Sequence, residues 1–92
     1  MANDANVKNV EELALFGRNI KQLGDNMLSA MQQAQKKMNQ VCDGWHDEKA
    51  DRFRADFDES IRMISRISEK FTEHSAYIKK LTDALNAYKN IR

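Results

Sequence analysis

The sequence predicts an all-α protein, an antiparallel two-helix hairpin that dimerises into a four-helix bundle. The chain of 92 residues contains no proline and three glycines, so little in it would break a long helix. Apolar residues recur at seven-residue steps with companions three or four residues away, which is typical of helices that bury one face. A short stretch at 43–46 interrupts this pattern. We therefore expect a single domain over 1–92, with helices at about 10–42 and about 47–90.

The first helix is predicted by a stripe of apolar residues. Asn9 followed by Glu12 resembles a capping box, in which two side chains satisfy backbone N–H groups at a helix start. The stripe then runs to the turn at spacings of three and four. It consists of Leu13, Ile20, Met27, Ala34 and Val41 at seven-residue steps, with Phe16, Leu23 and Ala30 three residues after the first three.

The turn is predicted at residues 43–46. Gly44 follows an aspartate there, and Asp-Gly is a turn dipeptide. Asp47 is a good N-cap for the next helix. So short a connection between two helices favours an antiparallel arrangement. Trp45 either plugs the end of the hairpin or is exposed to a partner, and both interpretations remain open. Cys42, the single cysteine, is expected to be a small buried side chain, with an intermolecular disulfide as the alternative.

The second helix carries the most regular pattern of the chain. One series at seven-residue steps has no polar member, and the other lies three residues further on. The two series are Ala50, Phe57, Ile64, Phe71, Ile78 and Leu85, and Phe53, Ser60, Ile67, His74, Leu81 and Tyr88. This spacing predicts a continuous amphipathic helix up to about residue 90.

Both stripes are wider than the contact between two helices requires. Gly17 and Gly24, each next to an apolar position of the first helix, cost about 1 kcal/mol relative to alanine in mid-helix. Seven residues apart, they would let another backbone approach closely. Stripes of this width suit a bundle of three or four helices, so we expect a second hairpin to complete the core. The predicted interface residues are Phe16, Gly17, Ile20, Leu23, Gly24, Met27, Met31, Phe53, Phe57, Ile64, Phe71 and Ile78.

No residue pattern predicts an enzyme, a cofactor or a metal site. His46 and His74 lie far apart and form none of the paired motifs that bind zinc. A net charge of +1 argues against nucleic acid as a partner. No apolar run is long enough to span a membrane, and the first residues lack the features of a signal peptide. We expect protein binding, in the cytosol or after export without a cleavable signal.

Residues 45–53, Trp-His-Asp-Glu-Lys-Ala-Asp-Arg-Phe, resemble the turn of the WXG-hundred proteins, the early-secretory-antigen-like substrates of type VII (ESX) secretion. That family has Trp-x-Gly between two helices, then a small residue and an aromatic one. The resemblance implies a homodimer, or a pair with a related WXG-type protein, and recognition by a secretion ATPase. It implies a secreted substrate, or a carrier or adaptor, and the alternative is an intracellular scaffolding subunit with no export.

The chain departs from that family at two places. Asp47 stands where the family has glycine, although an N-capping acid also starts a helix. The family's export signal is a C-terminal Tyr-x-x-x-Asp/Glu, whereas Tyr77 is followed four residues later by Leu81, and Tyr88 by Arg92. Tyr88 is the residue of the tail that we expect to be recognised. The missing acid leaves open that a heterodimer partner supplies the signal.

Overall fold

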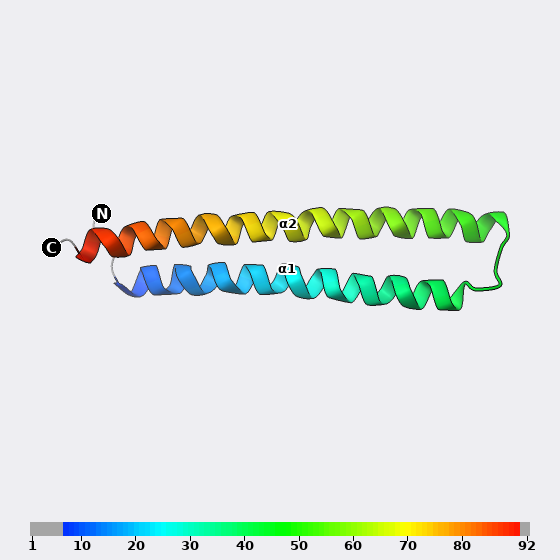
Figure 1. Ribbon diagram of the computed structural model, residues 1–92, viewed down its shortest axis with the longest axis horizontal. Helices are drawn as coiled ribbons and strands as arrows, with labels where there is room; N and C mark the ends of the chain where they lie inside the picture. Colours follow the sequence, from blue (N-terminus) through cyan, green and yellow to red (C-terminus); the bar gives the residue numbers. More distant parts are fainter. Residues whose placement is uncertain (1–6, 91–92) are drawn as a thin grey trace.

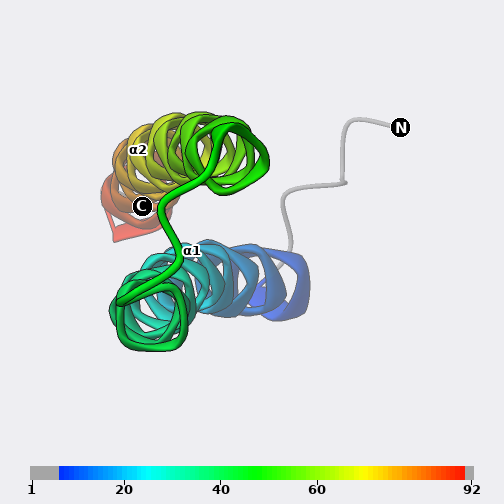
Figure 2. The same ribbon diagram turned by 90° about the vertical axis from the view of Figure 1, so that its right-hand side faces the viewer.

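The computed structural model describes residues 7–90, with side chains for 9–88. Helix α1 (Val7–Val41) and helix α2 (Glu48–Asn90) run antiparallel along the length of the molecule (Figure 1). The molecule measures 68 × 18 × 17 Å. Seen end-on, it is a single pair of helices joined by the turn (Figure 2). The predicted all-helical hairpin is confirmed.

The structure contradicts the cap predicted at the start of α1 and confirms the cap predicted at the start of α2. Helix α1 begins at Val7, so Asn9 lies inside the helix. The predicted capping box at Asn9 and Glu12 is therefore wrong, because an N-cap residue has to stand just before the helix. Helix α2 begins immediately after Asp47, whose Oδ1 accepts a hydrogen bond from the Ala50 N–H at 2.9 Å. This geometry is that of an N-cap, and the prediction for Asp47 is confirmed.

The line of contact between the two helices, here called the seam, is formed largely by small residues. A Cβ atom added to Gly17 would lie 2.8 Å from Cγ2 of Ile78, and one added to Gly24 would lie 3.1 Å from Cβ of Phe71. The close approach of backbones expected at these glycines is thus made within the hairpin. The buried residues of the seam are Val10, Gly17, Gly24 and Met38 from α1, Cys42 just after its end, and Ala50, Ser68 and Thr82 from α2.

The bulkiest apolar side chains lie beside the seam. Phe16 and Leu23 are 56% and 53% exposed. Among the described residues no large side chain is fully buried. Two helices in contact along one line shield only a narrow strip of each, so the remaining width of the apolar stripes is left uncovered.

Candidate functional site: one apolar face and the turn

The exposed apolar side chains of the two helices lie on the same side of the hairpin. Leu23 precedes the seam residue Gly24, and Ile67 and Leu81 precede the seam residues Ser68 and Thr82. One residue corresponds to a rotation of about 100° about a helix axis. Because α2 faces α1 and runs in the opposite direction, the same rotation moves both sets of side chains to one side. The hairpin therefore has one side on which apolar side chains from both helices gather.

We call this surface the apolar face. Its outer members are exposed and its inner members, next to the seam, are half-buried. At the turn end of the face, the rings of Phe53 and Phe57 lie 5.9 Å apart. The apolar face consists of Leu13, Phe16, Ile20, Leu23, Met27 and Ala30 from α1 and Phe53, Phe57, Ile64, Ile67, Phe71, Ile78 and Leu81 from α2. Contiguous apolar surface of this kind marks interaction sites on soluble proteins.

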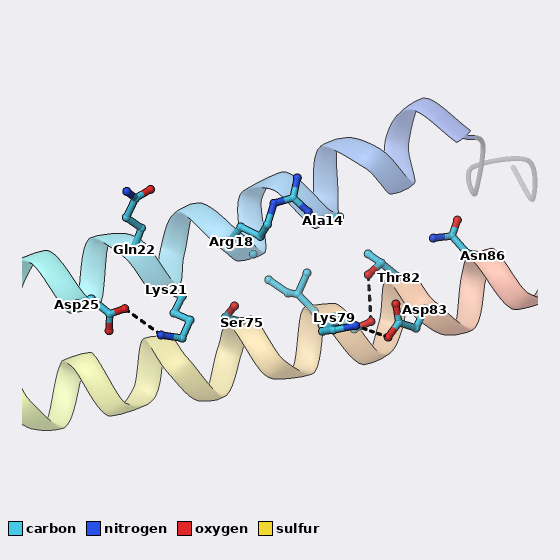
Figure 3. Close-up of a pocket in the computed structure, with 12 residues that line it drawn as sticks. Ala14, Arg18, Lys21, Gln22, Asp25, Ser75, Lys79, Thr82, Asp83 and Asn86 are labelled. Atoms are coloured by element: carbon cyan, nitrogen blue, oxygen red, sulfur yellow. Dashed lines mark hydrogen bonds and ion pairs between the residues drawn. The ribbon is translucent and has the colours of Figure 1, made fainter.

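The opposite side of the hairpin is polar. Arg18 and Asp83, which each follow a seam residue by one, line a groove there together with Lys79 (Figure 3). Lys79 is paired with Asp83 at 2.8 Å. Its neighbour across the groove, Lys21, is paired with Asp25 at 2.9 Å. These ion pairs are exposed and span one helical turn, so each contributes at most about 0.5 kcal/mol. They keep this side hydrated, in contrast to the apolar face.

The predicted interface residues fall into two groups in the structure. Gly17, Gly24 and Met31 belong to the seam within the hairpin, where Met31 is half-buried. The others are members of the apolar face. The sequence pattern does not separate these groups, because seam and face occupy neighbouring positions of one wide stripe. The predicted interface residues that lie in the apolar face are Phe16, Ile20, Leu23, Met27, Phe53, Phe57, Ile64, Phe71 and Ile78.

The turn is held by a residue that the sequence patterns did not single out. Nη2 of Arg54 donates hydrogen bonds to the backbone carbonyls of Cys42, at 2.6 Å, and of Trp45, at 2.9 Å. Nη1 of the same guanidinium pairs with Asp51 at 3.4 Å. The last carbonyls of a helix have no partner within it, and Arg54 supplies one at the end of α1. A usable signal existed, because Arg54 stands fourteen residues, two seven-residue steps, before the seam residue Ser68 and so occupies a seam position.

Gly44 gives the turn its shape. Its φ is +88°, a left-handed backbone conformation that favours glycine. The buried Cys42 lies just before it, and its N–H donates to the carbonyl of Met38 at 2.9 Å. The thiol is therefore a small buried side chain at the helix end, as one interpretation of the sequence expected. A disulfide through Cys42 would need the turn to open.

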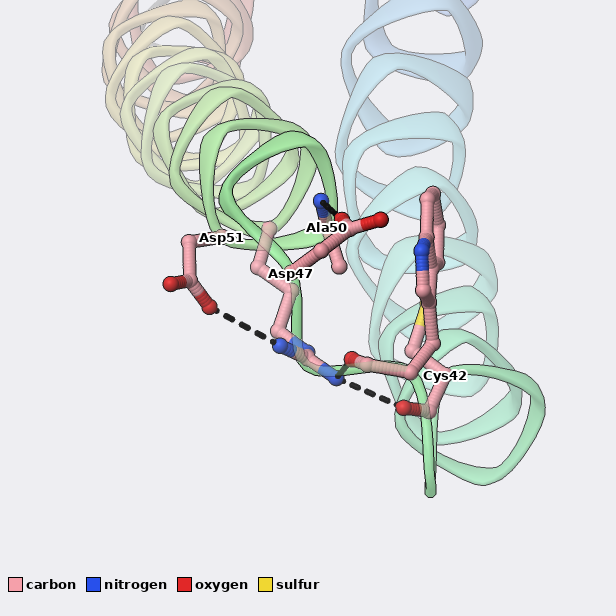
Figure 4. Close-up of polar contacts among 6 residues, drawn as sticks. Cys42, Asp47, Ala50 and Asp51 are labelled. Carbon is pink, nitrogen blue, oxygen red and sulfur yellow. Dashed lines mark hydrogen bonds and ion pairs between the residues drawn. The ribbon is translucent and has the colours of Figure 1, made fainter.

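Trp45 is tied to the turn and remains partly exposed. The hydrogen bond from the backbone N–H of Ala50 (Figure 4) holds the pKa of Asp47 below its ordinary value, and the neighbouring Trp45 side chain lowers it further. Both interactions favour the charged carboxylate. Trp45 is 42% exposed. Its backbone N–H donates to the carbonyl of Cys42 at 3.0 Å, so the turn holds the residue while part of its side chain stays open to solvent.

Tyr88 lies near the end of α2 and is 70% exposed. Arg92, four residues beyond it, is outside the described residues. Within residues 7–90, no group of three His, Cys, Asp or Glu side chains is placed to hold a metal ion. Neither α1 nor α2, over the part described, is long and apolar enough to cross a membrane.

Comparison with known proteins assigns a family. The family model described as "WXG100: Proteins of 100 residues with WXG" matches residues 8–88. This match covers the turn and nearly the whole of both helices. Comparison with curated proteins gave no match, and comparison with solved structures gave none either.

Proposed function

The chain belongs to the WXG100 family, and from this premise we propose that it works in a type VII secretion system as a secreted substrate, or as the carrier or adaptor of one. The family consists of small helical proteins of such systems, and its members typically pair with each other. The proposed activity is protein–protein binding. The proposed binding surface is the apolar face, and the proposed partner is a second copy of the chain or a related family member.

The uncovered apolar face is the observation that carries the proposal. Its inner members, such as Ile64, Phe71 and Ile78, are only half-buried in the hairpin. Burial of apolar surface contributes about 25 cal/mol per Å², so a hairpin that leaves this face in water forgoes much of the stabilisation available to it. If the apolar faces of two hairpins pack against each other, their side chains together form the core of a four-helix bundle.

The sizes of the apolar side chains along α1 favour a second, antiparallel copy of the chain as the partner that packs on the apolar face. On α1 the face carries Phe16, Ile20 and Leu23 before Gly24, whereas Met27 and the small Ala30 follow it, with the half-buried Ala34 one turn further on. An antiparallel copy, with α1 stacked on α1, places the bulky half of one helix against the small half of the other. The arrangement is self-complementary, as a two-fold symmetric interface requires. It also places the turn of one copy beside the helix ends of the other.

The experiment is light scattering over a concentration series, with Cys42 kept reduced. We expect a molar mass twice the 10.7 kDa of one chain. Leu23→Asp and Ile67→Asp each place a charge in the apolar face and should shift the protein towards monomer. Gln22→Asp places the same charge on the polar side and should leave the dimer intact. A folded wild-type monomer at every concentration, also in the presence of a co-expressed WXG100 protein, would contradict binding through this face.

The carrier or adaptor role is proposed beside that of a free substrate because of the residues that follow the two tyrosines. Neither Tyr77 nor Tyr88 is followed four residues later by an acid, whereas the family's export signal carries one there. A partner that has this acid would then supply the signal for a pair. The alternative, an intracellular scaffolding subunit, predicts no export. Detection of the tagged protein in culture supernatant without lysis excludes that alternative, and its absence there in cells with an active system would exclude export.

A further inference from the structure

The polar side of the hairpin contains a groove of about 580 Å³ between α1 and α2. This volume is in the range of ligand-binding sites on proteins. The floor of the groove is formed by small residues, of which Gly17 is buried and Ala14 and Ser75 are half-buried. Its rim consists of exposed charged and amide side chains. Because the groove lies opposite the apolar face, pairing of two hairpins through that face would leave it accessible.

The charges of the groove follow a regular order along the hairpin (Figure 3). Each lysine is paired with an acid of its own helix one turn away, at 2.9 Å in α1 and at 2.8 Å in α2. Because the helices run in opposite directions, these two acids lie at opposite ends of the groove, and the cations lie between them. The order is Asp25, Lys21, Arg18, Lys79 and Asp83. The groove therefore has a positive centre and negative ends.

Arg18 lies at the centre of this order, and its charge is not balanced as the charges of the lysines are. Among the residues that the structure describes, no carboxylate pairs with Arg18, and its side chain makes no hydrogen bond. The residue is exposed. A guanidinium presents a planar fork of N–H donors that binds a carboxylate through two hydrogen bonds. The centre of the groove is thus suited to a single carboxylate from outside the hairpin.

Two further features narrow the class of ligand. The negative ends repel a polyanion, so nucleic acid or an anionic membrane, which brings charge over the whole length, fits the groove poorly. An exposed ion pair by itself stabilises a complex little, so an occupant also has to bury an apolar side chain on the floor at Ala14 and Gly17. Between Ala14 and Asp25 the groove is about 16 Å long, at about 1.5 Å per helical residue. This length has room for about five extended residues.

We propose that this groove binds a short segment of a partner protein in which an aspartate or glutamate stands next to apolar residues. The acidic side chain binds Arg18, and an apolar neighbour packs on the floor between α1 and α2. The inference goes beyond the proposed function, since it concerns the other side of the hairpin and does not require the dimer. The hairpin then has two separate binding surfaces, one apolar and one selective for acidic segments.

The test is selection of phage-displayed random dodecapeptides on the full chain, with Cys42 kept reduced. We expect the selected peptides to carry an acid flanked by apolar residues. Arg18→Gln should lose this preference, and Arg18→Glu should instead select peptides with lysine or arginine. Arg66→Gln, which removes an exposed arginine of α2 outside the groove, should select as the wild type does. Circular dichroism checks that the variants keep their helices, as expected because both arginines are exposed.

The affinity of one selected peptide then measures the contact with Arg18. The labelled peptide, and an analogue with an amide in place of the acid, are titrated with the protein and followed by fluorescence anisotropy. Loss of the acid or of the guanidinium should each raise the Kd about tenfold, the effect of hydrogen bonds to a charged group. Because both changes remove the same contact, Arg18→Gln should bind the amide analogue no more weakly than it binds the acidic peptide.

Three results would count against the groove. Selection without a preference for acids would overturn the proposal, and so would equal affinity of a selected acidic peptide for the wild type and Arg18→Gln. Binding to vesicles of phosphatidylcholine and phosphatidylserine that Arg18→Gln loses, with no acidic peptide selected, would assign the groove to a lipid surface and overturn the proposal as well. A wild type that is monomeric by light scattering but selects acidic peptides would contradict the proposed pairing and support this inference.

Discussion

Single residues of this hairpin act through the space they leave or the backbone groups they bind. Gly17 and Gly24 are seam residues because a side chain there would collide with α2. Asp47 and Arg54 act at the turn. Asp47 accepts from an N–H group at the start of α2, and Arg54 donates to the carbonyls of Cys42, just after α1, and of Trp45 in the loop. Both are responses to the unpaired backbone groups that every helix end carries.

Replacing Gly17 by alanine tests the seam at residue scale. The added Cβ would lie 2.8 Å from Cγ2 of Ile78, and the χ1 angle of a β-branched side chain in a helix is restricted. We expect a net loss of about 1 kcal/mol of unfolding free energy, with overpacking exceeding the gain in helix propensity. In an Ile78→Ala background the same change should become stabilising. Urea denaturation of the wild type, the two single variants and the double variant measures these changes in unfolding free energy. Equal effects of Gly17→Ala in both backgrounds would exclude the collision with Ile78.

The pKa of Asp47 predicts a response to acid. Since the carboxylate is favoured in the folded state, its pKa is lower there than in the unfolded chain. The stabilisation is therefore fully present at neutral pH and is lost as the pH falls through the folded-state pKa. Asp47→Asn keeps a capping side chain that does not titrate. The thermal midpoint of the wild type should fall more than that of this variant between about pH 7 and about pH 3. Parallel curves would show that Asp47 does not contribute.

At the scale of elements, the turn is held in place by a side chain of α2. Arg54 lies in the second turn of α2 and binds carbonyls at the end of α1 and in the loop. The short connection, the left-handed Gly44 and this guanidinium together fix the angle at which the chain reverses. Trp45, whose carbonyl is one of the two acceptors, is positioned by the same contact.

Arg54→Met tests this unit, because methionine keeps the apolar stem and removes the donors. We expect a loss of about 1–3 kcal/mol, the range for hydrogen bonds to a charged group. Trp45 is the single tryptophan, so its fluorescence reports on the turn directly, and it should become more accessible to acrylamide. Arg52→Met is the control, since Arg52 is exposed and contacts Glu48 at 3.5 Å. Equal quenching in the two variants would show that Arg54 does not position the tryptophan.

At the scale of the whole molecule, the hairpin has two unlike sides and two unlike ends. Its polar side is covered with ion pairs and hydroxyl groups, and its apolar face lacks a cover within the hairpin. Trp45 is at the turn end and Tyr88 at the other. An antiparallel dimer would place the Trp45 of one copy at the same end of the bundle as the Tyr88 of the other.

Tyr88→Ala is the prediction at this scale. We expect the variant to keep its helix content and its dimer, because Tyr88 lies near the end of α2 and is largely exposed, and to be exported less. Tyr77→Ala changes the other exposed tyrosine and should be exported as the wild type is. The measurement is the amount of tagged protein in culture supernatant relative to the cell pellet. Equal export of both variants would remove Tyr88 from the recognition of the tail.

The sequence by itself determined the two helices, the turn and the cap at Asp47. Helical periodicity, turn dipeptides and caps depend on residues close together in the chain, so they can be read locally. The same reasoning placed the capping box of the first helix wrongly, because Asn9 can serve within a helix as well as before one. It also identified Gly17 and Gly24 as sites of close approach, without identifying which helix approaches.

Only the tertiary structure decided which part of the wide stripe forms the seam. Every series of the stripe repeats at the same seven-residue step, so the spacing does not tell which series faces the other helix. The helices meet along the line of small residues, at Gly17, Gly24, Ala50 and Ser68, because backbones pack closest there. The bulky series with Phe16 and Leu23 is thereby left on the surface. The seam position of Arg54 could have been read from the spacing, but its acceptors are brought to it only when the chain turns back.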